Sequence, residues 1–540
     1  MRVFRGGRVF DGDRYLGDAS VAVDQDRVVA VGPDGEVREH AGAGAEEVDL
    51  AGGLLTPGFR DAHVHPLVGG LERLRCDLSG LSGREEYLDA VRRHAEEHPD
   101  TEWVRGGGWS IAAFPDEGPT AADLDAVVPD RPVFLPSSDH HDAWVNSRAL
   151  ELAGVGAGTP DPPDGWFVRD ERGHPTGAVR EAAMSPVWQR LTTSREEDRQ
   201  ALLEAQRYLH SLGITGWQDA LIGGYAAIDD PTQAYLDLLA AGELTGRVRA
   251  AQWWDRHRGP EQVEDLVRRR GELADAGLDA GSVKLMMDGV AETLTATVTE
   301  PYLHSDGCHC GDRGLAFMSR EQTREAMQAA DAAGFQVHVH AIGDRAVHDA
   351  LDGLELARRV NGLNDQRHHV AHLQLVRPED RPRFGRLGVA ANLEGIWAHA
   401  ATPAVELMRP HLDEERMGWH YPFAELAASG AVLCGGSDWP VNTPDPMSAI
   451  HVLVNRLPAG SANGTQPLLP EQGLTLRQAF AAYTSGSAWV NHERAGAGRI
   501  QVGAVADLAV LDRDPFRDDP EQIAEARVVR TYVAGRAVSG

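Results

Sequence analysis

The sequence predicts an α/β protein built on a (β/α)8 barrel of the TIM type, with a small β-sandwich domain formed by both chain ends. Three observations predict this fold. Apolar, strand-like segments alternate with amphipathic helical segments through the middle of the chain. Both ends are rich in short strands, and neither end has enough of them for a stable sheet of its own. The interval after the first barrel strand is too long for one helix and indicates an insertion.

The 540 residues suffice for a large barrel with an appended domain. We assign residues 1–56 and 486–540 to the β-sandwich domain, and residues 57–485 to the barrel, with a lid-forming insertion at about 68–193. The terminal strands are expected at Arg2–Val9, Asp18–Val23, Arg27–Val31, Val48–Leu50, Ala504–Leu511 and Val528–Val538, the last with a turn at Gly535.

Eight barrel strands follow from the alternation of apolar and amphipathic segments. They are expected at Leu54–His65, Ile214–Asp219, Arg249–Trp254, Val283–Asp288, Phe335–Ala341, His368–Gln374, Val389–Trp397 and Val432–Asp438. Helices are expected between most of them, at Arg195–Leu212, Gln262–Ala276, Ser319–Ala333 and Arg345–Val360. Within the insertion we expect a helix at Arg84–His98, a strand at 131–135 leading to a polar loop at 139–146, and a hairpin-like segment from Gly165 to Glu181.

Composition excludes several classes of partner. A formal net charge of -30 argues against nucleic acid, which would repel such a surface. No apolar run approaches the ~20 residues that span a bilayer, and the N-terminus has no signal-peptide pattern, so we expect a cytoplasmic protein without a membrane partner. The 4 cysteines are too few for a disulfide framework. Cys308-His309-Cys310 is more typical of free thiols in a loop than of a zinc site.

The stretch from Thr56 to Pro66 carries the first chemical signal. Side chains on a strand alternate between faces, so Asp61, His63 and His65 point the same way and the two imidazoles can close on one cation. This pattern is weak alone, because most histidines are surface or hydrogen-bonded core residues.

Lysine usage gives a sharper signal. Lys+Arg totals 52, yet Lys284 is the only lysine. A lysine that persists in such an arginine-rich chain is expected to do what a guanidinium cannot, such as act as an amine nucleophile or take up CO2 as a carbamate. The alternative is that a single residual lysine must lie somewhere.

Further ligand-type residues fall at the carboxyl ends of the expected strands, where a barrel of this type places its chemistry. They are Lys284, His340, His372 and Asp438. Each has an ordinary alternative. His338 shares a face with His340, His368 with His372, and Asp438 could be a helix N-cap. We favour His340 and His372 because each lies nearer its strand end.

These residues identify a resemblance to the amidohydrolase superfamily, and within it to amidohydrolase family 3, the YtcJ-like branch that includes N-substituted formamide deformylase. The resemblance covers nearly the whole chain. The matching stretches are Pro57 to Pro66, Trp144 to Ser147, Lys284 with Asp288-Gly289, His340 to Ala346, Arg367 to Gln374, Ser437 to Val441, and the closing segment Gly498 to Leu511.

The resemblance implies a centre with one or two metal ions, usually Zn²⁺, with other divalent metals kept open. His63, His65 and Asp438 would hold one ion, His340 and His372 the other, and a carboxylated Lys284 would bridge them. Asp438 would also take the proton of the attacking water. The implied activity is hydrolysis of a non-peptide C–N bond in a small amide, such as an N-substituted formamide or N-acyl amine, by metal-activated hydroxide. A cyclic amidase, a deaminase and a non-catalytic binding protein of the same fold remain alternatives.

The substrate pocket is predicted from polar and aromatic residues near the expected rim. The candidates are Trp109, His141, Asn146, Glu181, Asp219, Asp288 and Trp397. Two departures from the family pattern affect the pocket: Ala371 stands where the family usually carries Glu, and residues 290–293 replace a small-polar run. The expected partner is a small-molecule amide, and a homodimer is kept open.

Overall fold

The computed structural model describes residues 1–540 apart from 115–117, 139, 164, 192, 225–229, 304–310 and 463. The segment Cys308-His309-Cys310 therefore lies outside the described residues, whereas Cys76 and Cys434 are buried free thiols. No helix in the described ranges is long and apolar enough to cross a bilayer.

Eight parallel strands form the barrel. Neighbouring strands follow one another in sequence: β8 (Phe59–Val64), β15 (Ile214–Ile222), β16 (Arg247–Trp253), β17 (Asp279–Met286), β18 (Gln336–Ala341), β19 (His369–His372), β20 (Ala390–Leu393) and β21 (Leu433–Gly435). Backbone N–H groups of Ser437 and Asp438 both donate to the His63 carbonyl, at 3.2 and 2.7 Å, which draws the end of β21 against β8. The sequence prediction of a TIM-type α/β fold is confirmed.

The helices around the barrel arise from amphipathic patterns and end signals. They include α7 (Arg195–Ser211), α9 (Val263–Asp275), α10 (Arg320–Ala332) and α11 (Asp344–Asn361), each close to its predicted range. Ser319 caps α10 through a capping box with Gln322, which satisfies backbone donors at the first turn. The apolar faces of α10 and α11 pack with the strands in one continuous core.

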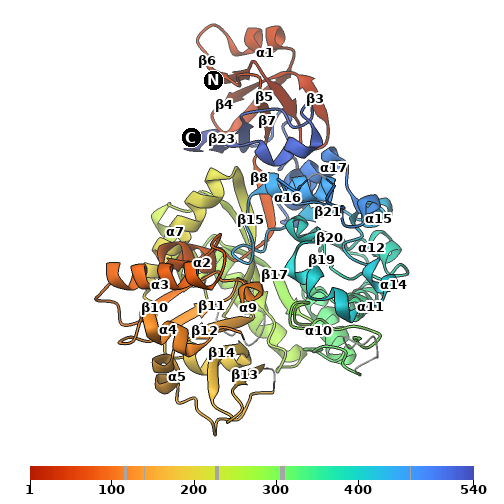
Figure 1. Cartoon of the computed structure of the whole chain (residues 1–540). Coiled ribbons are helices and arrows are strands. Elements are labelled where there is room, and N and C mark those ends of the chain that lie inside the picture. The colour runs from red at the N-terminus through yellow and green to blue at the C-terminus, as the bar shows by residue number, and fades with distance from the viewer. Residues whose placement is uncertain are drawn as a thin grey trace.

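Strands from both ends of the chain lie side by side, at the opposite end of the molecule from the insertion (Figure 1). One sheet has the order β5-β4-β1-β6 and the other the order β24-β23-β22-β7-β2-β3. Their bounds are β1 (Arg2–Arg5), β2 (Arg8–Phe10), β3 (Tyr15–Asp18), β4 (Ser20–Asp24), β5 (Arg27–Gly32), β6 (Glu46–Asp49), β7 (Leu54–Pro57), β22 (Leu508–Leu511), β23 (Val528–Val533) and β24 (Arg536–Ser539).

Two predicted strands are divided in the structure. The segment Leu54–His65 splits at Gly58 into β7, which joins the terminal sheet, and β8, which joins the barrel. Only glycine fits at this crossing, because a Cβ on Gly58 would lie 2.4 Å from the Thr215 hydroxyl. The segment Arg2–Val9 splits into β1 and β2 at Gly6, whose φ of 75° favours glycine.

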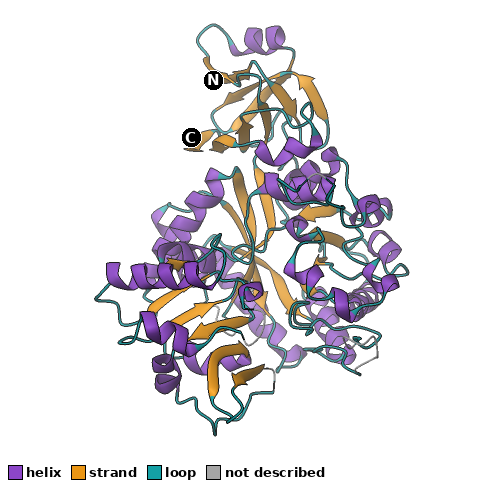
Figure 2. Ribbon diagram, in the orientation of Figure 1, coloured by secondary structure: helices purple, strands orange, loops and turns teal. Residues whose placement is uncertain are grey.

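The insertion lies beside the barrel and has its own mixed sheet and covering helices (Figure 2). The sheet order is β13-β14-β12-β11-β10-β9, and the strands are β9 (Cys76–Asp77), β10 (Val104–Gly107), β11 (Val133–Pro136), β12 (Asp142–Val145), β13 (Gly165–Arg169) and β14 (Pro175–Glu181). Helix α3 (Arg84–Glu97) and the β13–β14 hairpin agree with prediction. The predicted polar loop at 139–146 is wrong in its second half, because Ala143, Trp144 and Val145 are fully buried and pair with β11 and β14.

Candidate metal centre

Six predicted ligand residues converge on one cavity at the carboxyl ends of the barrel strands. His63 lies on β8, Lys284 on β17, His340 on β18 and His372 at the end of β19. His65 follows β8, and Asp438 follows β21. All six line a cavity of about 120 Å³. The parallel sheet brings them together because the carboxyl ends of its strands meet at the same rim.

Asp438 is the centre of the first group. Its Oδ1 lies 3.3 Å from His63 Nε2 and 3.2 Å from His65 Nε2. Lys284 Nζ lies 3.2 Å from the same His63 nitrogen. The only lysine of the chain is therefore in contact with the His-x-His pair from the opposite part of the barrel, as the sequence interpretation requires.

His340 and His372 form the second group. Their ring centroids lie 4.2 Å apart. His340 Nε2 lies 3.3 Å from the Gly289 carbonyl, an arrangement that places a proton on Nε2 and leaves Nδ1 for a ligand. His372 Nε2 is buried and has no hydrogen-bond partner among the described residues.

Backbone strain coincides with the site. His372 has φ 75° and Asp438 has φ 56°, values that L-residues rarely adopt. Such strain persists only where surrounding structure imposes it. At Asp438 that structure includes Asp61, whose carboxylate accepts hydrogen bonds from the Ser437 hydroxyl at 2.6 Å and the Ser437 N–H at 3.1 Å. Asp61 thus ties β8 to the loop that carries Asp438.

Burial dominates the electrostatics of the centre. Desolvation holds the pKa of His63 and His340 well below the usual range, and the nearby Lys284 charge lowers the pKa of His63 further. Desolvation also lowers the pKa of Lys284 to about 8. Burial acts to raise the pKa of Asp438, but the hydrogen bond from His65 and the positive charges of His372, His65 and Lys284 outweigh it and lower that pKa. A neutral imidazole at His63 and at His340 and a carboxylate at Asp438 are the protonation states that metal ligands need.

The residues present suit a divalent metal. Imidazole nitrogen and carboxylate oxygen are donors that Zn²⁺ binds in proteins. His63, His65 and Asp438 offer one donor atom each within 4.8 Å of one another. The nitrogens His65 Nδ1 and His372 Nε2 are buried without hydrogen-bond partners among the described residues. Burying a polar atom without a partner costs free energy, and a cation bound to such a nitrogen would remove that cost.

Three of the seven predicted substrate residues line the cavity: His141, Glu181 and Trp397. His141 Nδ1 and Glu181 Oε1 are 2.9 Å apart, and Trp397 stacks on His372 with ring centroids 5.8 Å apart. Glu181 has φ 49°, so the insertion also carries strain where it faces the cavity.

The other four predicted substrate residues have structural contacts instead. Trp109 is fully buried in the insertion core, because Phe114 and Trp144 pack against its indole ring. Its indole N–H donates a hydrogen bond to the Leu135 carbonyl.

Asn146 is the N-cap of α5 (Ser147–Ala153), so its amide is fully used by backbone groups. Asp219 accepts from the Tyr235 hydroxyl, and Asp288 accepts from the N–H groups of Thr297, Ile342 and Gly343. Asp288 Oδ1 also lies 3.6 Å from His340 Nε2, so it supports a predicted ligand without lining the cavity.

The polar residues at the centre that sequence reasoning missed include Glu394, His140 and Glu292. Glu394 is fully buried directly after β20 and contacts His63 and His372. His140 and Glu292 line the cavity from the insertion and from the segment after β17. A signal existed for Glu394, since it is an acidic residue inside the predicted strand Val389–Trp397. The other two lie in loops, where sequence periodicity gives no direction.

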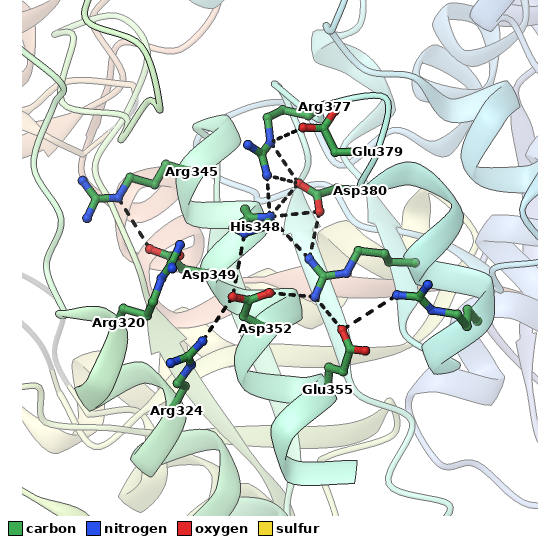
Figure 3. A network of polar contacts seen from close by, with 12 residues as sticks. Arg320, Arg324, Arg345, His348, Asp349, Asp352, Glu355, Arg377, Glu379 and Asp380 are labelled. Carbon is green, nitrogen blue, oxygen red and sulfur yellow. Dashed lines mark hydrogen bonds and ion pairs between the residues drawn. The ribbon is translucent and has the colours of Figure 1, made fainter. Parts of the chain in front are cut away.

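A second histidine–carboxylate cluster lies on the outer helices. His348, Asp349 and Asp352 of α11 could by distance hold a cation. Figure 3 shows Asp349 joined to Arg320 of α10 and to Arg345, and, beside them, His348 joined to Asp352 and Asp380, with Asp352 also joined to Arg324 of α10. We call these residues together the outer network. Arg320 pairs with Asp349 at 2.7 Å, and Arg383 pairs with Asp352 at 2.8 Å. The carboxylates are thus already neutralised by fixed cations.

Comparisons with known proteins agree with this fold. A family model described as "Amidohydrolase family" matches residues 46–539. The chain is 30% identical to the putative amidohydrolase YtcJ of Bacillus subtilis over 546 residues, covering 99% of each chain. It is 29% identical to N-substituted formamide deformylase of Arthrobacter pascens, covering 96% of this chain and 94% of that enzyme.

Among solved structures, an uncharacterised metal-dependent hydrolase from Pyrococcus horikoshii superposes with a TM-score of 0.73 at 26% identity. The likeness covers 96% of this chain and 99% of that one.

Proposed function

Because this chain belongs to the amidohydrolase family, we propose that it is a metal-dependent hydrolase that cleaves a non-peptide amide C–N bond in a small molecule. The substrate class we propose is an N-substituted formamide or another N-acyl amine. One observation carries the proposal: six ligand-type residues on or directly after five barrel strands, including the only lysine, line one cavity. The relative named N-substituted formamide deformylase supports the choice of bond.

The residues have distinct roles in this proposal. His63, His65 and Asp438 would hold one Zn²⁺ ion, and His340 and His372 a second, with Lys284 as a carbamate between them. Bound at such a site, a divalent ion lowers the pKa of water from 15.7 to roughly 7 and polarises a carbonyl oxygen. Carbamate formation joins the Lys284 nitrogen to the carbon of CO2 and releases one proton, which requires the neutral amine. The lowered pKa of Lys284, about 8, makes that form accessible near neutral pH.

Asp438 would move the proton. Its lowered pKa keeps it a carboxylate at neutral pH, so it can accept a proton from the attacking water. The same group can return that proton to the nitrogen of the leaving amine, which must be protonated to depart.

The cavity wall supports an amide with an apolar substituent. Met184, Leu221, Trp253, Met286, Val290, Ile342 and Trp397 form most of its apolar lining. The insertion contributes Pro136, His140, His141, Glu181 and Met184, and so covers the rim as a lid that excludes water. The His141–Glu181 pair offers a hydrogen-bonding group to the polar end of a substrate.

The test combines metal analysis with a substrate panel. Purified protein is analysed for bound metal, then assayed for amine or ammonia release from N-substituted formamides, N-acyl amines, lactams and aminated heterocycles. We expect bound Zn²⁺ and amine release from the acyclic amides. Strong chelators should abolish turnover, and added Zn²⁺ should restore it. Full activity in metal-free protein, or activity confined to lactams or aminated rings, would overturn the proposal.

A further inference from the structure

Glu394 occupies an unusual position between the two groups of predicted ligands. It follows β20 directly, is fully buried, and precedes the short helix η4 (Gly395–Trp397). Its Oε1 lies 3.2 Å from His63 Nδ1, and its Oε2 contacts His372 Nδ1. One carboxylate thus reaches a histidine of each group, and in each case it meets the nitrogen Nδ1.

We propose that Glu394 is the positioning residue of the metal centre, fixing the orientation and the tautomer of His63 and His372 at once. The inference rests on the proposed function, because it concerns ligands of the proposed metal ions. A carboxylate that accepts an Nδ1–H leaves Nε2 unprotonated and free to bind a metal. His63 Nε2 indeed faces Asp438 and Lys284, at 3.3 and 3.2 Å.

The contacts favour this role over direct ligation by Glu394. His63, His372 and Glu394 could by distance hold an ion among themselves. That ion would bind the Nδ1 atoms. His63 Nε2, which faces Asp438 and Lys284, would then not be a ligand of that ion. His338 Nε2 lies at the same 3.2 Å from His63 Nδ1 and is its hydrogen-bond partner in this structure, so Glu394 competes with His338 for the Nδ1 proton. A carboxylate oxygen is a stronger acceptor than a neutral imidazole nitrogen.

The turn that carries Glu394 holds His372 from a second side. Trp397, at the end of η4, stacks on the His372 ring at an interplanar angle of 15°. Asn392 lies two residues before Glu394, and its side-chain amide donates a hydrogen bond to the Ala62 carbonyl at 3.0 Å. This bond ties β20 to β8, the strand that carries His63. The segment from Asn392 to Trp397 therefore fixes ring plane, tautomer and strand spacing together.

The experiment measures metal binding by the full-length protein. Zn²⁺ affinity and stoichiometry of Glu394→Gln and Glu394→Ala are compared with wild type by chelator competition. We expect roughly 10–100-fold weaker binding with unchanged stoichiometry at saturating Zn²⁺, as for other groups that orient metal-ligating histidines. Glutamine keeps one acceptor oxygen and should lose less than alanine.

Glu72→Gln is the matched control. Glu72 is also buried and lies 3.2 Å from a histidine nitrogen, His140 Nε2, but contacts none of the predicted ligands. Its Zn²⁺ affinity should equal that of wild type. Wild-type affinity in both Glu394 variants would overturn the inference, and so would loss of a whole Zn²⁺ equivalent at saturation, the sign of a direct ligand. A wild-type protein that binds no divalent metal would instead overturn the proposed function.

A crystal structure of the Zn²⁺-loaded wild-type enzyme tests the same point without a variant that could misfold. We expect Nε2 of His63 and of His372 on the metal and Glu394 at hydrogen-bond distance from both Nδ1 atoms. A Glu394 oxygen at about 2.0–2.2 Å from zinc, the range of a carboxylate ligand, would overturn the inference.

Discussion

The cavity centre and the outer network are built from the same residue types, yet only one suits a metal. Both join histidines to carboxylates within ligand distance. In the outer network Asp380 pairs with Arg377 and Arg383 at 3.0 and 2.9 Å (Figure 3). In the cavity, Asp438 contacts two imidazoles, Lys284 contacts His63, and no arginine lines the described wall.

The two clusters differ in the basic side chains that lie beside their carboxylates. A guanidinium stays charged at every accessible pH and forms bidentate pairs, so it neutralises a carboxylate permanently. Imidazole and amine groups can be neutral near pH 7 and then act as donors to a cation. The near-exclusion of lysine from the chain sharpens this contrast, because the Lys+Arg total of 52 consists of arginine apart from Lys284.

Lys284→Arg should have the largest effect, on both the metal content and the activity of the cavity centre. It places a permanent cation in the cavity and removes the amine that can form a carbamate. We expect loss of one metal equivalent and a fall in kcat of roughly 10³-fold, since the metal contributes several kcal/mol to catalysis. Elemental analysis and amide turnover measure both, with circular dichroism as the check on folding. Wild-type turnover in this variant would contradict the assignment.

Asp380→Asn should damage stability and leave the metal centre intact. The buried Asp380 carboxylate accepts from Arg377, Arg383 and His348, and removing one partner of a buried ion pair costs about 3 kcal/mol. Urea unfolding measures that loss, and metal analysis should find wild-type content. A loss of metal from this variant would show that the two clusters are not independent.

Acidification should lower the contribution of the buried barrel histidines to the stability of the metal-free protein. Burial holds the pKa of His63, His338, His340 and His369 well below 6.5 in the folded state. At these four histidines the unfolded chain therefore binds more protons than the folded chain below pH 6.5, so their contribution to the free energy of unfolding falls as pH decreases, by at most about 1.4 kcal/mol per pH unit per histidine.

Urea unfolding between pH 7.5 and 5.0, with chelator present, measures this slope. His369→Gln should reduce this slope by the contribution of one histidine. In the outer network, burial raises the pKa of Asp380, but hydrogen bonds from Arg383 and His348 outweigh burial and lower that pKa below 3.8. The contribution of Asp380 is therefore present above pH 3.8 and is lost only below it. Burial raises the pKa of Asp61, Asp219 and Asp288 to about 7, 6 and 7, which opposes the histidine slope, so the difference between wild type and His369→Gln is the test. Identical slopes in the two proteins would contradict the histidine assignment.

Arg324→Lys should have the smallest effect and is the mirror image of Lys284→Arg. Arg324 pairs with Asp352 at 3.3 Å near the surface, where lysine can supply the same charge. We expect a change below about 1 kcal/mol in the free energy of unfolding and no change in activity. A large loss of activity would show that the outer network supports the cavity.

Some parts of the fold and site were predictable because they depend on local periodicity. Alternating apolar strands and amphipathic helices predict a barrel, and a barrel brings the ends of its strands together. Hence His63, His65, Lys284, His340 and Asp438 could be placed on one rim before any coordinates. The choice of His340 over His338 also followed from position along the strand, and only His340 lines the cavity.

Other parts depended on neighbours from distant segments. Trp109 resembles a pocket residue in sequence, but Phe114 and Trp144 enclose it in the insertion core. Glu394 resembles an ordinary strand end, but the barrel brings it against His63 and His372. Sequence alone determined which residue types reach the rim, because strand and helix periods are properties of the local backbone. Only the tertiary structure decided which side chains face the cavity, because that depends on packing between segments hundreds of residues apart.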